Sequence, residues 1–334
     1  MGDIIDPHVH LTKGPSDYGK GWERCFEGLA SEIGTNSKEE LDEVVKINKA
    51  LGVTKAGIIC QDNSRIFDFR STIEYGQEVI DQYPDFWYGT VGVTPVNKYW
   101  ELDRKNLDLF KYAIDSLGFK CMMTAPTYER FQADDRRAYP FYEAALERDI
   151  PIMFHNSSMT KPPTLAPLEF GDPRHIDKVG IDYPDLRMCI EHMGFPWENV
   201  TLGMMEKNPN LYTEISSLWD RPYLTTWNLV IAKEYGYQYL RSTKTPYKYD
   251  EGLPDEDYVQ DRVLSRVMYG SDFYGTYDLT KPGGFHIRGD FAKYVNFVKR
   301  DINAVAEKTG WPKFTQKEID GILGDNAKNF IKNL

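Results

Sequence analysis

Cysteine is scarce in this chain of 334 residues, which contains only Cys25, Cys60, Cys121 and Cys189. The four cysteines lie far apart and include no C-x-x-C pair, a spacing that argues against the dense disulfide framework of small secreted proteins. A reducing environment is the simplest setting for such a chain. We therefore expect a cytoplasmic location.

Long apolar runs are also missing. No stretch approaches the roughly 18 consecutive apolar residues that make up a membrane-spanning helix. The first six residues lack the basic region of a secretory signal, and Asp6 stands where a myristoylation motif requires serine or threonine. These absences predict a soluble protein with no membrane partner.

Positive charge is in deficit, because 40 lysines and arginines face 51 aspartates and glutamates, which gives a formal net charge of −11. A negative field repels polyanions, and no basic cluster in the sequence offsets it. A nucleic acid is therefore a poor candidate partner. A small-molecule substrate is the better expectation.

What the chain does have is a regular alternation of strand-like and helix-like segments. Short apolar or β-branched runs lie near 3–10, 55–60, 88–94, 118–125, 150–156, 187–193, 211–216 and 267–273. One amphipathic segment starts at a capping box headed by Ser37 and stops at Gly52, and others lie near 71–83, 105–117, 138–148, 196–208, 290–309 and 315–331. Eight strand-helix units predict an α/β fold, a single (β/α)₈ TIM barrel over residues 1–334.

The connection at 217–266 is longer than a barrel crossover requires, and it contains Trp219, Arg221 and several tyrosines. Loops that follow barrel strands surround the active site, so this segment is a candidate lid, and Trp219 and Arg221 are candidate substrate contacts. An aromatic helical decoration that serves packing or oligomerisation explains the composition equally well.

Four of the eight predicted strands carry side chains that bind metals or transfer protons. The first contains His8 and His10, which the two-residue period of a strand puts on one face. The fifth ends in His155, the sixth in His192 and the eighth in Asp272. A single histidine at the end of a buried strand is more often a hydrogen-bonded core residue. Because barrel strands share one carboxyl-end rim, however, all five side chains can converge on one point.

The order and spacing of these motifs resemble the amidohydrolase superfamily, in particular the branch with the aminocarboxymuconate-semialdehyde and resorcylate decarboxylases. The resemblance extends along nearly the whole chain. It rests on Ile5-Asp6-Pro7-His8-Val9-His10, Tyr183-Pro184-Asp185-Leu186 ahead of Glu191-His192-Met193-Gly194, Gly270-Ser271-Asp272, and Ile322-Leu323-Gly324-Asp325-Asn326-Ala327.

The resemblance implies that His8, His10 and His155 ligate one divalent metal ion and that Asp272 is a further ligand or a base. It also implies that His192 is an acid/base outside the coordination shell, with direct ligation as the alternative. Imidazole nitrogens favour zinc, and manganese is the second choice. A homodimer is expected from the family alone.

Three other residues carry side chains that could bind a metal or substrate. Lys120 could be carboxylated and bridge two metals, as in other branches of the superfamily, but the resemblance favours one metal and Lys120 lies inside the fourth predicted strand. A structural or substrate-facing role is the better expectation for it. His175, on a predicted helix, and His286, in a glycine-bearing loop, are expected to be solvated or structural.

The leading functional hypothesis is a metal-dependent hydrolase of a small amide, lactone or related carbonyl compound, in which His192 or Asp272 manages protons. Its rival is a metal-dependent non-oxidative decarboxylase, a carboxy-lyase of an unsaturated or aromatic acid, whose carboxylate Arg65, Arg70 or Arg221 could hold. A metal-dependent DNase is disfavoured by the acidic composition. A non-enzymatic metal-binding barrel is the remaining alternative.

Overall fold

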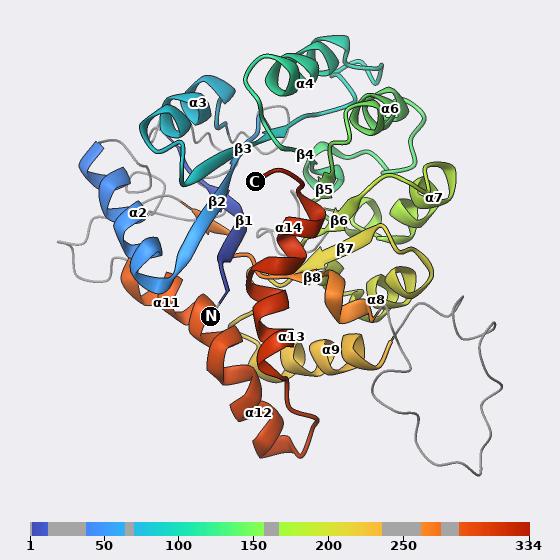
Figure 1. The fold of residues 1–334 in the computed structure, drawn as a ribbon. Helices are drawn as coiled ribbons and strands as arrows, with labels where there is room; N and C mark the ends of the chain where they lie inside the picture. The colour runs from blue at the N-terminus through green and yellow to red at the C-terminus, as the bar shows by residue number, and fades with distance from the viewer. Residues whose placement is uncertain (1, 13–37, 64–69, 157–166, 236–261, 275–286) are drawn as a thin grey trace.

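The computed structural model describes residues 2–12, 38–63, 70–156, 167–235, 262–274 and 287–334. In this part of the chain, nine parallel strands form one curved sheet in the order β8-β7-β6-β5-β4-β3-β2-β1-β9 (Figure 1). The strands are β1 (Ile4–His10), β2 (Val53–Cys60), β3 (Trp87–Gly92), β4 (Cys121–Thr124), β5 (Ile152–Phe154), β6 (Met188–Ile190), β7 (Leu211–Glu214), β8 (Val267–Met268) and β9 (Phe273–Tyr274). Each predicted strand overlaps one of them, and the predicted (β/α)₈ barrel is confirmed.

The last predicted strand, at 267–273, is divided into two. Its first part, β8, pairs with β7, and its second part, β9, pairs with β1. The break includes Asp272, whose φ of 53° lies in the left-handed region that a regular strand cannot contain. The amide of Asp272 donates to the carbonyl of His8 over 2.9 Å. This divided strand joins the two edges of the sheet and closes the barrel.

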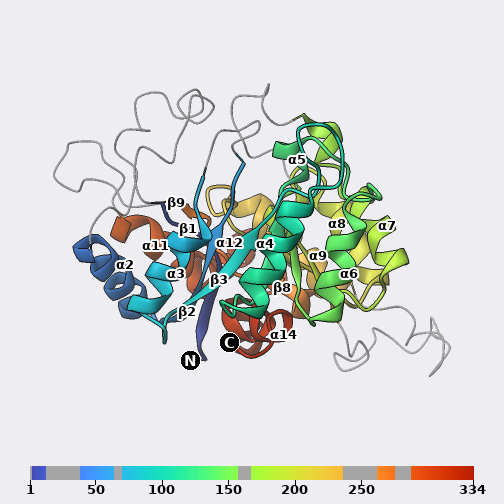
Figure 2. The ribbon, with the colours of Figure 1, turned by 90° about the horizontal axis from the view of Figure 1, so that it is seen from above.

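Helices surround the sheet, those up to α9 between successive strands and those from α11 onward after the last strand (Figures 1 and 2). They are α2 (Lys38–Leu51), α3 (Ile73–Gln82), α4 (Arg104–Asp115), α5 (Pro126–Glu129), α6 (Tyr139–Glu147), α7 (Arg174–Asp182), α8 (Glu198–Lys207), α9 (Pro222–Glu234), α11 (Ile287–Asn296), α12 (Ile302–Thr309), α13 (Gln316–Asp320) and α14 (Asn326–Phe330). The last two predicted helices are interrupted by π-helical turns at Phe297–Asp301 and Gly321–Asp325. The sequence pattern had set no bounds for α5, α7 or α9. Ser37, which heads the predicted capping box, lies outside the described residues.

Part of the candidate lid at 217–266 is described. Helix α9 packs between α8 and α12 on the outside of the barrel. Residues 236–261 lie outside the described part of the chain, so the lid remains a prediction. No helix within the described ranges has the length and apolar character needed to cross a bilayer.

The C-terminal helices close the amino end of the barrel. An apolar cluster inside the barrel joins Ile5, Ile59 and Met153 to Phe330 of α14, whose ring lies 5.1 Å from that of Tyr212 between centroids. Both marked ends of the chain lie at this side of the molecule (Figure 2). The opposite rim, formed by the carboxyl ends of the strands, is therefore the open end of the barrel.

The close approach of the C-terminal segment to β1 predicts a glycine requirement. A Cβ added to Gly324 would lie 2.0 Å from the backbone oxygen of Asp3. Because backbone atoms cannot move aside cheaply, Gly324→Ala should lower the free energy of unfolding by about 1–3 kcal/mol. The matched control is Gly203→Ala in α8, where no atom lies within 4 Å of the added Cβ.

In the control, alanine should raise the free energy of unfolding by up to about 1 kcal/mol, since glycine is the poorer helix former. Urea denaturation of both variants checks the pair. Equal effects of the two substitutions would contradict the close packing of Gly324 on β1.

Candidate metal centre

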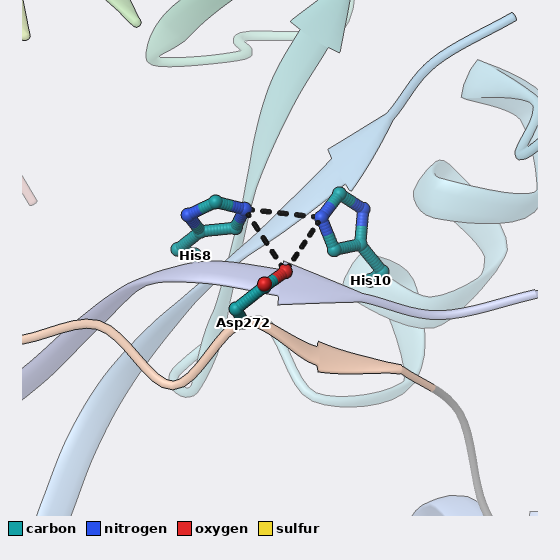
Figure 3. Close-up of side chains that lie close together, drawn as sticks. All are labelled: His8, His10 and Asp272. Carbon is teal, nitrogen blue, oxygen red and sulfur yellow. Dashed lines mark hydrogen bonds and ion pairs between the residues drawn. The ribbon is translucent and has the colours of Figure 1, made fainter. Parts of the chain in front are cut away.

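Three side chains meet at the open rim of the barrel. His8 and His10 come from β1, and Asp272 comes from the break between β8 and β9 (Figure 3). The Nε2 atoms of the two histidines lie 3.0 Å apart, and Asp272 Oδ1 lies 3.4 Å from the first and 3.3 Å from the second. All three side chains are buried. The structure thus brings together the predicted H-x-H pair and the predicted carboxylate.

His155 and His192 face the same cluster from β5 and β6. Their ring centroids lie 5.0 Å apart, and that of His192 lies 5.3 Å from that of His8. The His155 ring stacks on Tyr128 of α5 at 4.3 Å, and the hydroxyl of Thr127 donates to the His155 carbonyl. The short helix after β4 therefore fixes the position of His155.

Three of the four histidines expose the same nitrogen to the cluster. His8 Nδ1 lies 3.2 Å from Glu214 Oε1, and His155 Nδ1 lies 3.0 Å from Glu191 Oε2. His192 Nδ1 lies 3.1 Å from the carbonyl oxygen of Ser216. Because ionised carboxylate and carbonyl oxygens only accept hydrogen bonds, each Nδ1 carries a proton when Glu191 and Glu214 are ionised, and the neutral rings of His155 and His192 keep their lone pair on Nε2. A buried lone pair so oriented is the form in which histidine ligates a metal.

Glu214 holds this arrangement together. Besides His8, its Oε1 accepts hydrogen bonds from the backbone amide of His192 at 2.8 Å and from the hydroxyl of Ser216 at 2.9 Å. One carboxylate at the end of β7 thereby orients groups on β1 and β6. Gly270 is its close neighbour, because an added Cβ there would lie 2.8 Å from Glu214 Oε2.

The backbone at the rim is strained at three consecutive strand ends. His192, Ser217 and Asp272 have φ values of 54°, 56° and 53°, in the left-handed region that side chains with a Cβ seldom adopt. They follow β6, β7 and the first half of the last strand. The Ser217 hydroxyl donates to Asp272 Oδ2, which leaves Oδ1 directed at His8 and His10. Such strain is concentrated at functional sites, where other contacts hold it in place.

Electrostatics at the rim favour a positive charge. Burial alone would lower the pKa of His8, but the carboxylates of Glu191 and Asp272 outweigh it and raise that pKa to about 10. Against the effect of burial, His8 lowers the pKa of Glu214 to about 2 and holds that of Asp272 well below its usual range. Within the described part of the chain, the groups that contact these two ionised carboxylates are histidines, serines and backbone amides, so the carboxylates draw a cation to this position.

The remaining histidines are neutral. Burial lowers the pKa of His10 and of His192, and it lowers that of His155 to about 4. The Nε2 atoms of His155 and His192 are buried and have no hydrogen-bond partner. Unprotonated imidazoles beside ionised carboxylates are the donor set that a divalent ion of the zinc type requires.

The donor set therefore fits a metal ion. His8, His10 and Asp272 present ligand atoms that all lie within 4.8 Å of one another, and they could hold one. His8 forms a second such group with Glu191 and His192. His155 belongs to neither group, and its Nε2 approaches from β5. His155, the further ligand that the resemblance implies, thus faces the cluster but is not one of the residues whose ligand atoms lie within 4.8 Å of one another.

Residues predicted for other roles lie elsewhere or outside the described ranges. Lys120 precedes β4, at the amino end of the strand and so at the opposite end of the barrel from the cluster. His175 of α7 is partly exposed and pairs with Asp134 at 2.9 Å. Neither can bind a metal at the rim. His286 is not described.

The predicted substrate contacts are not gathered at the cluster. Arg70 is exposed and lies 3.5 Å from Asp62. The Arg221 guanidinium lies 4.3 Å above the ring of Phe195, and Trp219 packs against Tyr294 of α11 at 5.0 Å. Arg65 lies outside the described residues. These four residues remain predictions.

Sequence reasoning missed Glu214 and Ser216 and did not assign a role to Glu191. Glu214 had a signal, since it is a carboxylate two residues before the end of the predicted strand at 211–216, much as Asp272 lies near the end of the eighth. Glu191 stood inside the quoted Glu191-His192 motif. Ser216 has no sequence signal, because its role depends on the position of His192.

The fold and the rim define the class of this protein as a (β/α)₈ barrel with a histidine and carboxylate cluster at the carboxyl ends of its strands. The sequence matches the family model described as amidohydrolase over residues 5–332. The chain therefore belongs to the amidohydrolase family, which confirms the resemblance. No curated protein matches the sequence.

Solved structures are similar along the whole chain. An uncharacterised TIM-barrel protein from Bordetella bronchiseptica is 15% identical, with a TM-score of 0.59 over 98% of each chain. The 4-oxalomesaconate hydratase of Rhodopseudomonas palustris is 17% identical, with a TM-score of 0.57 over 98% of this chain and 95% of its own. The 5-carboxyvanillate decarboxylase of Novosphingobium aromaticivorans, complexed with manganese and 4-hydroxy-3-methoxy-5-nitrobenzoic acid, is 14% identical, with a TM-score of 0.59 over 98% and 96%. At these identities the likeness establishes the fold.

The hydrogen bonds of Glu214 predict a role in metal affinity. Glu214→Gln removes the charge that orients His8 and should weaken zinc binding by about 10–100-fold. Glu147→Gln, on the exposed surface of α6, is the control and should leave binding unchanged. Competition with a chromogenic chelator measures both, and elemental analysis of the parent protein should give one metal ion per chain. Unchanged zinc affinity in Glu214→Gln, with the fold intact, would refute this role.

Proposed function

We propose that this protein is a metal-dependent hydrolase of a small amide, lactone or related carbonyl compound. The observation that carries the proposal is the state of His192. Its Nδ1–H is directed at the Ser216 carbonyl, its Nε2 is buried without a hydrogen-bond partner beside the His8 cluster, and burial lowers its pKa. A neutral imidazole with a free lone pair at the reaction centre is a general base.

His8, His10 and Asp272 would hold the metal ion, and His155 would add a ligand from β5. A divalent cation bound there supplies Lewis acidity for a carbonyl oxygen and for water. Zinc is the proposed ion because the donors are mostly imidazoles, and manganese is the alternative.

The chain's own residues account for the proton transfers. His192 Nε2 takes a proton from the water that attacks the carbonyl carbon, and it returns that proton to the departing nitrogen or oxygen as the C–N or C–O bond breaks. The Ser216 carbonyl accepts the Nδ1–H throughout and keeps the ring in one orientation. Asp272, held by Ser217, stays ionised and stabilises the positive charge that His192 acquires.

Decarboxylation is the second candidate, and two observations favour it. The similar solved structures include 5-carboxyvanillate decarboxylases. Burial also raises the pKa of Glu191, which lies 3.0 Å from His155, so this carboxyl could carry the proton that replaces CO₂ on carbon. The DNase and the non-enzymatic barrel receive no support from the geometry of the rim.

His192→Ala separates a base from a ligand. We expect this variant to keep most of its zinc and to lose at least about 100-fold in turnover, since a general base contributes a factor of about 10²–10⁴. His10→Ala should instead lower zinc occupancy. Elemental analysis and turnover on the same preparations provide the measurement, and loss of zinc from His192→Ala would make His192 a ligand.

The reaction class is tested by isotope labelling. A panel of lactones, anilides and aryl carboxylates is screened with the zinc-loaded and manganese-loaded protein, and any substrate found is converted in ¹⁸O-water. Hydrolysis places one labelled oxygen in the acid product. Release of CO₂ with no label in the organic product would replace the hydrolase by the decarboxylase and leave the metal centre standing.

A further inference from the structure

The rim has a second half that the metal centre does not use. Ile59 of β2 and Met123 of β4 belong to the apolar cluster inside the barrel, and the two-residue period of a strand puts Gln61 and Ala125 on the same inward face one layer higher. Gly92, at the end of β3, lies between them in the sheet order. These inward positions are small or neutral, whereas those on the β5 to β8 side are charged.

Gln61 lies next to the strand that carries the metal ligands. Ser71 joins the two strand ends, because its hydroxyl donates to the carbonyl of Leu11 at 2.8 Å and its amide donates to the carbonyl of Gln61 at 2.8 Å. Leu11 directly follows His10. A Cβ on Gly92 would lie 2.4 Å from the Cβ of Gln61, so the glycine leaves the room that the Gln61 side chain occupies.

Two amide side chains at the end of β2 are buried with unpaired polar atoms. Gln61 is 5% exposed and its Oε1 has no hydrogen-bond partner, and Asn63 is 3% exposed and its Nδ2 has none. A buried polar atom left unpaired costs about 1–3 kcal/mol. Such a cost persists in a folded protein where a ligand supplies the missing partner.

The chemistry of these atoms selects a type of group. As placed, Gln61 Oε1 accepts and Asn63 Nδ2 donates, so a group that both donates and accepts can pair with the two atoms. A carboxylate only accepts. None of the buried side chains in the described residues of β2, β3 and the positions just after them is charged, so no buried cation is present there to hold an anion.

Space for the rest of a ligand adjoins these residues. A cavity of about 1000 Å³ opens beside the ends of β2 and β3 and is lined by Asp62, Thr94 and the loop before α4. None of the cluster residues lines it. Asp62, which lines the cavity, stands between Gln61 and Asn63 in the chain, and neither amide lines it.

We propose that Gln61 and Asn63 form the specificity-determining edge of the centre and bind a hydroxyl or carboxamide group of the substrate. This inference rests on the proposed metal-dependent activity and adds the chemical class of the group that is recognised. The part of the substrate that contacts Gln61 and Asn63 is neutral and polar. The carbonyl that is attacked is held at the metal centre.

The test uses the zinc-loaded protein and benzohydroxamate, whose two oxygens chelate a metal ion. Calorimetric titration compares this parent with its 3- and 4-substituted hydroxyl, carboxamide and carboxylate analogues. At least one hydroxyl or carboxamide analogue should bind about tenfold more tightly than the parent, and the carboxylates should gain nothing. In Gln61→Leu the gain should be lost, so that the analogue and the parent bind this variant with equal affinity.

Stability of the ligand-free protein is the second measurement. Gln61→Leu removes an unpaired buried polar atom and should leave the thermal midpoint equal or higher, with Gln82→Leu on the exposed surface of α3 as the control. A lower midpoint for Gln61→Leu alone would mean that the amide is a structural hydrogen-bonding group, and the inference would be wrong.

The two hypotheses fail in different ways. If no form of the loaded protein binds benzohydroxamate, the proposed metal centre fails and this inference fails with it. If the parent binds but no neutral analogue gains, or if a carboxylate gains most, the metal centre stands and the role of Gln61 and Asn63 is refuted.

Discussion

The Glu214 carboxylate is the constraint on which the rim depends. It reaches His8 on β1, the amide of His192 after β6 and the hydroxyl of neighbouring Ser216, so one side chain fixes two other strand ends against its own. A buried carboxylate is costly unless hydrogen bonds and charges compensate for it. Here the compensation comes from the groups that it orients. Loss of Glu214 would thus change the direction of two imidazoles at once.

The rim is asymmetric in its electrostatics. Carboxylates and imidazoles occupy the strand ends on the β5 to β8 side and on β1, whereas the ends of β2 and β3 have buried amides, threonines and small residues. Charged groups interact strongly where water is excluded. Neutral polar groups beside them contribute directional hydrogen bonds but only a weak electric field. Under the proposed function, reaction chemistry and recognition chemistry would lie on different parts of one opening.

The sequence was sufficient to predict the barrel and the residues that meet at its rim, because the strand period and the shared carboxyl end are local consequences of the fold. His8, His10 and Asp272 could be placed together on that basis. The break in the last strand could not be predicted, since Asp272 takes a left-handed conformation that its residue type does not indicate. Glu214 was passed over because its partners are contributed by other strands. Its function lies in those long-range contacts and leaves no periodic signal.

The amino end of the barrel has a consequence for how this protein can be joined to other molecules. Lys328 of α14 pairs with Asp3 at 2.8 Å, so the first strand and the last helix emerge side by side on the side away from the histidines. Another folded module, a solid support or a membrane tether attached at either point would lie behind the barrel. Fusion partners could thus be exchanged, singly or in pairs, without blocking the open rim at the carboxyl ends of the strands.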